Sequence, residues 1–66
     1  MNVQLNGKLR EVPEACTVQA LLVELASDRP GVAVAVDGKV VPRSAHADTP
    51  LHEGAVVEVI RAVGGG

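Results

Sequence analysis

Residues 17–27, TVQALLVELAS, decide the fold, because they form the one segment whose apolar residues follow the period of a helix. Thr17 is a favourable N-cap residue, and the spacing of the apolar residues after it places them on a single buried face. Val23 points away from this face and is expected to be exposed. Residues 27–31 (SDRPG) end the helix in a turn-rich loop. We therefore predict one amphipathic helix of about three turns, whose buried face comprises Val18, Leu21, Leu22 and Leu25.

Short apolar segments before and after this helix are typical of β-strands. Residues 32–36 (VAVAV) are apolar on both faces, which fits a strand covered on both sides or one with small alanines on its thinner side. Residues 42–54 form a long loop, with one helical turn expected near residues 44–47. The predicted strands are residues 2–5, 8–12, 32–36, 39–41 and 55–60.

The Asn-Gly pair at residues 6–7 is a strong signal for a tight hairpin turn between the first two strands. A strict two-residue turn pairs Leu5 with Lys8 and leaves Leu9 on the face opposite Leu5. A one-residue bulge reverses the placement of Leu9. The sequence leaves both registers open.

The element order strand, strand, helix, strand, strand, strand predicts an α+β fold. A single helix crossing one face of a small mixed sheet of about five strands is the simplest way to bury the apolar stripe. This arrangement is the β-grasp, or ubiquitin-like, fold. We expect residues 1–63 to form one domain and residues 64–66 to form a flexible glycine tail.

Composition limits the classes of function. The chain has 66 residues, 47% of them apolar, a net charge of −2 and no Phe, Tyr or Trp. Its six basic residues are scattered, and no aromatic side chain can stack on a base, so nucleic-acid binding is not expected. No apolar run is long enough to span a membrane. A cytoplasmic protein is expected, because the N-terminus lacks a secretion signal and the lone cysteine forms no internal disulfide.

Cys16, His46 and His52 are the remaining candidates for chemistry. Cys16 directly precedes the helix N-cap, where the helix dipole can lower a thiol pKa, but an inert structural role is preferred. The two histidines have a spacing that belongs to no helical metal pair, so we expect surface histidines and no metal site. The eight carboxylates show no pairing in a predicted cleft, so catalysis by this chain is not expected.

Alternation in the last strand separates its two faces. Glu58 prefers water, so Val57 and Val59 should face the helix. Val56 and Ile60 then share the outer face with Glu58. Apolar residues on the open face of a sheet can form a docking patch for another protein, but apolar atoms also make up about half of any protein surface. Both interpretations stay open.

The chain ends RAVGGG, residues 61–66. A C-terminal glycine carboxylate has no side chain beside it and can pass through a channel too narrow for other residues. A carboxylate is a poor electrophile until its oxygen becomes part of a leaving group, and adenylation by ATP provides that group. The folded domain would then be the handle by which an enzyme holds the tail, and its contacts would offset the entropy lost on ordering the glycines. Arg61, just before the tail, either meets an acidic patch on a partner or is solvated.

The sequence resembles the ThiS family, the small sulfur carriers of thiamine biosynthesis. The resemblance runs through the whole chain and rests on the order and spacing of several short segments. These are an N-terminal strand into Asn6-Gly7, Thr17-Val18 followed by Leu21-Leu22, the VAVAV strand at 32–36, VVPR at 40–43, VEVI at 57–60 and AVGGG at 62–66.

The resemblance implies the chemistry of Gly66. An E1-like adenylyltransferase of the ThiF type would use ATP and Mg²⁺ to convert the Gly66 carboxylate to an acyl-adenylate, and a persulfide sulfur would then give a thiocarboxylate. A thiazole synthase of the ThiG type would accept that sulfur. Gly65 and Gly66 match the terminal pair of the family, and Gly64 matches members that end in three glycines. No cofactor bound to the chain itself is implied.

Two departures from the family pattern affect local stability rather than the sulfur chemistry. His46 lies near the place where members often carry an aromatic residue, and Gly54-Ala55 stands where they often have Gly-Asp.

Two other functions stay open. One is sulfur transfer in another pathway, such as molybdopterin assembly or tRNA thiolation. The other is a ubiquitin-like adaptor whose C-terminus is never activated.

Overall fold

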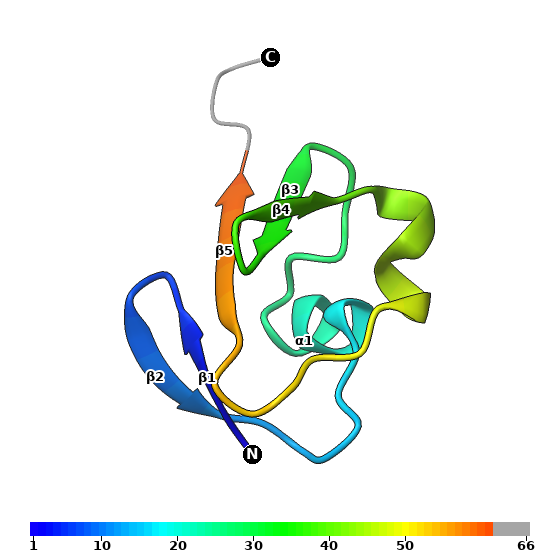
Figure 1. The fold of residues 1–66 in the computed structure, drawn as a ribbon. Coiled ribbons are helices and arrows are strands. Elements are labelled where there is room, and N and C mark those ends of the chain that lie inside the picture. The colour runs from blue at the N-terminus through cyan, green and yellow to red at the C-terminus, as the bar shows by residue number, and fades with distance from the viewer. Residues whose placement is uncertain (62–66) are drawn as a thin grey trace.

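A computed structural model describes residues 1–61, and residues 62–66 lie outside this description. Within residues 1–61, five strands form one mixed sheet in the order β2-β1-β5-β3-β4, and a single α-helix packs on one face of it (Figure 1). The predicted β-grasp fold is confirmed. The elements are β1 (Asn2–Leu5), β2 (Lys8–Glu11), α1 (Val18–Glu24), β3 (Val32–Val36), β4 (Lys39–Val41), the 3₁₀ helix η1 (Arg43–Asp48) and β5 (Val56–Arg61).

The first hairpin adopts the register of a strict two-residue turn. Leu5 pairs with Lys8, and Gln4 pairs with Leu9. The turn residues Asn6 and Gly7 both have positive φ angles, 50° and 83°, which matches the turn type that Asn-Gly favours. Leu9 therefore shares the outer face of the sheet with Gln4 and is 75% exposed.

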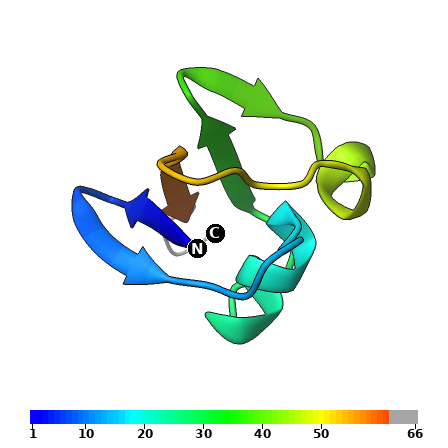
Figure 2. The same ribbon diagram turned by 60° about the horizontal axis from the view of Figure 1, so that its bottom comes forward.

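The sheet has one buried and one open face. Figure 2 shows the strands on one side of the molecule and α1 with η1 on the other. In β3 the valines point toward the helix and the alanines point outward, since Val34 is buried while Ala33 is exposed. Of the two interpretations of the VAVAV segment, the one with small alanines on the less covered side of the strand is therefore correct. In β5, Val57 is fully buried and Val59 packs against the core, as the alternation predicted.

Helix α1 begins where the sequence indicated. The Thr17 Oγ1 atom accepts a hydrogen bond from the Ala20 N–H at 3.1 Å, which caps the first turn. Leu21 and Leu22 are each 1% exposed and form the centre of the buried face, whereas Val23 is 57% exposed. Both outcomes confirm the predicted stripe.

The helix is shorter than the predicted three turns, because it ends at Glu24 rather than near Ser27. Ala26 has a φ of 56°, in the left-handed region. The Ala26 N–H donates to the Val23 carbonyl at 3.0 Å, and the Ser27 N–H donates to the Leu22 carbonyl at 2.8 Å. This pair of bonds is a Schellman motif, which satisfies the last carbonyls and stops the helix.

Ala26 is a position at which glycine is expected to stabilise the fold. An L-residue in the left-handed region carries a cost of about 1 kcal/mol that glycine lacks. Ala26→Gly should therefore raise the free energy of unfolding by roughly 0.5–1 kcal/mol, measured by urea denaturation. The same substitution at Ala20, an exposed position inside α1, should lower it by a similar amount. Equal signs at the two positions would contradict the assignment of the helix end.

The core is built without aromatic side chains. It lies between α1 and the inner face of the sheet, and the partly buried Leu25 packs against its edge. The buried hydrophobic residues are Val3, Val12, Cys16, Val18, Leu21, Leu22, Val34, Leu51, Ala55 and Val57.

The loop between β4 and β5 contains the predicted helical turn as η1, and it corrects one expectation. His46 is buried, 6% exposed, and is not the surface histidine that the sequence suggested. Its Nε2 atom lies 3.1 Å from the Val41 carbonyl oxygen. The turn folds back against β4, and the Thr49 hydroxyl caps it by donating to the Ala45 carbonyl at 2.7 Å. This folding covers the imidazole, which loop composition alone did not indicate.

Candidate functional site

The candidate site is the end of β5 and the outer face of the sheet. Gly64, Gly65 and Gly66 lie outside the described residues, and Arg61 is the last residue that the structure places. β5 ends at the opposite end of the molecule from the N-terminus (Figure 1). The tail therefore follows from the central strand of the sheet, between β1 and β3.

The side chain of Asn6 fixes this last part of β5. β1 ends at Leu5, and beyond it the Asn6 amide takes over the pairing: the Val59 N–H donates to Asn6 Oδ1 at 2.9 Å. Asn6 Nδ2 donates in return to the Val59 carbonyl at 3.4 Å. The Asn6 backbone N–H also donates to the Val57 carbonyl at 2.9 Å. The turn of the first hairpin thus holds the base of the tail on the side that β3 does not cover.

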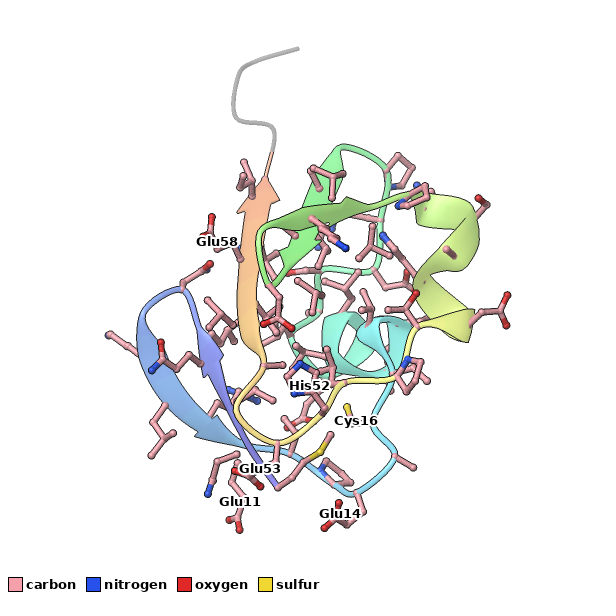
Figure 3. All side chains as sticks on the ribbon, in the orientation of Figure 1. Glu11, Glu14, Cys16, His52, Glu53 and Glu58 are labelled. Carbon is pink, nitrogen blue, oxygen red and sulfur yellow. The ribbon has the colours of Figure 1, made fainter. Side chains whose placement is uncertain are left out.

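The outer face carries an apolar surface, which we define by its four exposed side chains: Leu9, Val40, Val56 and Ile60. Val56 is 42% and Ile60 58% exposed, and both lie on β5. Gln4 of β1 lies between Leu9 and Val56, and Ala35 of β3 lies between Val40 and Glu58. The four side chains are therefore carried by β2, β4 and β5, with other residues between them. Glu58 lies among these residues and points away from α1 (Figure 3).

Arg61 does not join the outer face. It pairs with Val32, whose side chain packs against the core, and the Arg61 guanidinium donates to the hydroxyl of Ser27. Ser27 is 1% exposed, so this hydrogen bond ties the end of β5 to the loop after α1. Of the predicted partner-binding residues, the structure places Val56 and Ile60 on the same face of β5, with Glu58 between them, and places Arg61 on the opposite face.

Cys16 has the environment of a structural cysteine. It is 5% exposed, and its Sγ atom donates to the Thr17 carbonyl at 3.5 Å. Burial, and to a lesser degree the negative charge of Glu24, raises the pKa of the Cys16 thiol. A raised pKa lowers the fraction of thiolate, which is the reactive form. The preferred inert role of Cys16 is consistent with this environment.

His52 is exposed, as predicted, and forms an ion pair with Asp37. Its Nε2 atom lies 2.6 Å from Asp37 Oδ2, and its Nδ1 atom lies 2.9 Å from the Glu53 carbonyl oxygen. Both neighbours are acceptors, so only the doubly protonated ring satisfies both. The hydrogen bond to Asp37, followed by that to Glu53, therefore raises the pKa of His52. The Val56 N–H donates to Asp37 Oδ1 at 2.9 Å, and this bond together with His52 lowers the pKa of Asp37.

These two pKa shifts predict how stability depends on pH. The raised pKa of His52 gives a contribution that is complete below its ordinary value of 6.5 and is lost as the pH rises through the folded-state pKa. The lowered pKa of Asp37 gives a contribution that is complete above 3.8 and is lost as the pH falls further. The pair therefore stabilises most between these two values. The melting temperature of the wild type should fall more than that of His52→Gln when the pH rises from about 5.5 to 8.5, measured by circular dichroism. Parallel curves for the two proteins would contradict the prediction.

Neither a metal site nor a membrane span is found in the described part of the chain. Among residues 1–61, no three His, Cys, Asp or Glu side chains gather closely enough to hold a metal ion. No helix within these residues has the length and apolar character needed to cross a bilayer.

Sequence reasoning missed three contributors to this region. Leu9 and Val40 complete the outer apolar surface, and the Asn-Gly turn signal would have placed Leu9 there once a two-residue turn was assumed. The hydrogen bonds between the Asn6 side chain and the Val59 backbone join positions 53 residues apart, and no local sequence pattern indicates them.

Comparisons with known proteins identify relatives of this chain. The model of the ThiS family matches residues 3–66. The crystal structure of a thiamine biosynthesis protein (ThiS) from Geobacter metallireducens is 35% identical and covers 100% of both chains, with a TM-score of 0.84. An NMR solution structure of a thiamine biosynthesis protein from the same organism is 36% identical, with a TM-score of 0.78 over 100% of this chain and 88% of that one.

A longer relative carries a different name. A thiazole synthase from Paramagnetospirillum magneticum is 36% identical over 66 residues, which is 100% of this chain. The chain spans 20% of the length of that protein, so most of the synthase lies outside the match.

Proposed function

Because the chain belongs to the ThiS family, we propose that it is a sulfur carrier of thiamine biosynthesis whose Gly66 carboxyl group becomes a thiocarboxylate. The observation that carries the proposal is the family match, which extends to Gly66 and so includes the glycine tail. The carrier acts as a protein co-substrate, and enzymes that recognise it perform the chemistry.

The proposed chemistry has three steps. In the first, a Gly66 carboxylate oxygen attacks the α-phosphorus of ATP on an adenylating enzyme, and pyrophosphate leaves with Mg²⁺ assistance from that enzyme. In the second, the terminal sulfur of a protein persulfide attacks the acyl carbon and AMP leaves. In the third, a thiol reduces the resulting acyl disulfide and releases the thiocarboxylate. Glycines at 64–66 suit the first two steps, because no Cβ atom widens the tail.

We propose that the outer apolar surface docks on a thiazole synthase, which accepts the sulfur. Two observations support this partner. The four exposed apolar side chains lie on the same face of the sheet, and β5, which carries two of them, leads into the tail. A relative named thiazole synthase contains a stretch similar to this whole chain, so in that protein the two parts share one polypeptide.

Substitutions on β5 test the docking surface. Val56→Thr combined with Ile60→Thr keeps β-branched side chains in the strand and removes apolar contact area. The loss of roughly 1 kcal/mol at each position should weaken binding to the synthase at least about tenfold, measured by calorimetry. Val23→Thr is the matched control, because Val23 is 57% exposed on the helix side. Unchanged affinity of the double variant would contradict the assignment of this surface.

The central experiment is intact-mass spectrometry. The carrier is incubated with an adenylating enzyme of the family, ATP, Mg²⁺ and a persulfide donor. A mass increase equal to replacement of one oxygen by sulfur is expected, and deletion of Gly66 should abolish it. No increase in the wild type would refute the proposal. Pathway assignment comes from growth: a deletion strain should require thiazole, and a requirement for molybdopterin or a tRNA thiolation defect would point to the other carriers.

A further inference from the structure

A small pocket lies at the end of β5, on the side of the sheet opposite the outer apolar surface. Its volume is about 170 Å³, and the loop between α1 and β3 forms most of its wall. Val32 pairs with Arg61, so the pocket adjoins the point at which the tail begins. Any protein that encloses the tail must therefore lie close to this pocket. The lining residues are Arg29, Pro30, Gly31, Val32 and Arg61.

Both arginines of the pocket bind neutral groups rather than carboxylates. Arg61 donates to the Ser27 hydroxyl, and Arg29 donates to the Ala26 carbonyl at 3.2 Å. Within residues 1–61, the two ion pairs are Arg10–Glu24 and His52–Asp37, and neither includes a pocket arginine. A guanidinium has five N–H donors, so each of the two retains donors for a further acceptor.

Three of the eight carboxylates lie far from the pocket. Glu11, Glu14 and Glu53 lie near the N-terminus, at the end opposite the pocket (Figure 3). The chain as a whole has a net charge of −2. Asp28, an exposed residue of the same loop, precedes Arg29, so the two pocket arginines stand beside one carboxylate. The lining itself carries two positive charges, and a complementary ligand would be an anion.

The wall of the pocket is held in place by the end of the helix. Ser27 is buried and donates through its N–H to the Leu22 carbonyl, and the Arg29 N–H donates to the Ser27 carbonyl at 3.0 Å. Gly31 has a φ of 90°, a conformation that favours glycine, and leads directly into β3. These contacts fix the backbone that carries Arg29 and reduce the entropy lost when a ligand binds.

We propose that this pocket receives a carboxylate side chain of the adenylating enzyme at the rim of its tail channel, where both guanidinium groups bind it. The planar fork of a guanidinium suits a carboxylate through paired N–H···O bonds. This inference rests on the proposed function, because it names a contact made by the enzyme that activates Gly66.

Distance favours a carboxylate of the enzyme over a phosphate of its nucleotide. Five residues follow Arg61, and an extended segment of that length spans roughly 17 Å. A tail extended far enough to place Gly66 at the α-phosphate therefore keeps the pocket well away from the nucleotide. The contact fixes the base of the tail while the carboxylate at its other end reacts.

The inference is tested by steady-state kinetics of adenylation, followed as ATP–pyrophosphate exchange over a range of carrier concentrations. Arg29→Gln should raise the KM for the carrier about tenfold with little change in kcat, since one charge-assisted contact is lost. The double variant Arg29→Gln with Arg61→Gln should raise KM further and reduce its dependence on NaCl concentration. Arg43→Gln is the matched control, because it removes one positive charge at the exposed start of η1.

Failure of this inference is distinguishable from failure of the proposed function. If the wild type is adenylated and Arg29→Gln has the KM of Arg43→Gln, the pocket contact is wrong while the carrier role stands. An absence of exchange with the wild type refutes the carrier role itself. Melting curves of all variants check that each variant is still folded.

NMR titration of the free carrier with AMP and phosphate tests the other source of an anion. Arginine-dependent shifts at Gly31 and Val32 at millimolar concentrations would overturn the carboxylate assignment.

Discussion

Leu21→Ala is expected to lower the free energy of unfolding by about 2–5 kcal/mol, because it removes a side chain from the centre of the core and leaves a cavity. Leu21 is 1% exposed and lies on the buried face of α1. Domains of this size are stable by only roughly 0.05–0.15 kcal/mol per residue, so the loss is comparable to the whole stability. Urea denaturation followed by circular dichroism measures it, since the chain has no Trp or Tyr for fluorescence.

Val23→Ala is the matched control for this substitution. It shortens an apolar side chain in the same helix, but Val23 is 57% exposed. A change within about 0.5 kcal/mol is expected, as for most surface positions. If both substitutions cost the same, α1 does not pack on the sheet by the face that contains Leu21.

An alanine added after Gly66 should abolish formation of the thiocarboxylate. The added residue moves the reactive carboxylate one position along and places a Cβ atom beside it, so the group no longer fits a channel suited to glycine. The fold should be unaffected, because the last described contacts of β5 end at Arg61. Intact mass after incubation with the adenylating enzyme, ATP and a persulfide donor measures the outcome.

A glycine added at the same place separates the two causes of this loss. It shifts the carboxylate without adding a side chain. Residual sulfur incorporation by this variant would show that part of the loss in the alanine variant comes from the width of the added side chain. If the protein is instead an adaptor that is never activated, either added residue should leave partner binding unchanged. In that case the unmodified protein should also incorporate no sulfur. Full sulfur incorporation by the alanine-extended protein would contradict activation at Gly66.

The fold was predictable from local patterns because each pattern had one strong physical cause. The Thr17 cap, the leucine stripe and the Asn-Gly turn each specify a conformation within a few residues. The end of α1 was not predictable in this way. Ala26 adopts a left-handed conformation that its residue type disfavours. The hydrogen bond from the Ser27 N–H to the Leu22 carbonyl helps to determine where the helix ends.

The candidate site was predictable only in part. Alternation along β5 was enough to place Val56 and Ile60 on the outer face. The charged residue Glu58 indicated which of the two faces of the strand is exposed. The partner of Arg61 was not predictable, since it comes from a loop 34 residues away. His46 was misplaced for a different reason: η1 folds back against β4, and the imidazole lies 3.1 Å from the Val41 carbonyl oxygen, a contact that loop composition does not indicate.

The central position of β5 has a consequence for how the protein is made. This strand follows every other strand in the chain, yet it joins β1 to β3 and so unites two otherwise separate hairpins. On the ribosome, the hairpins β1–β2 and β3–β4 emerge first and must wait for β5 before the sheet can close. Shape is thus acquired late in translation, and nascent chains that stop short of β5 should be open to proteolysis.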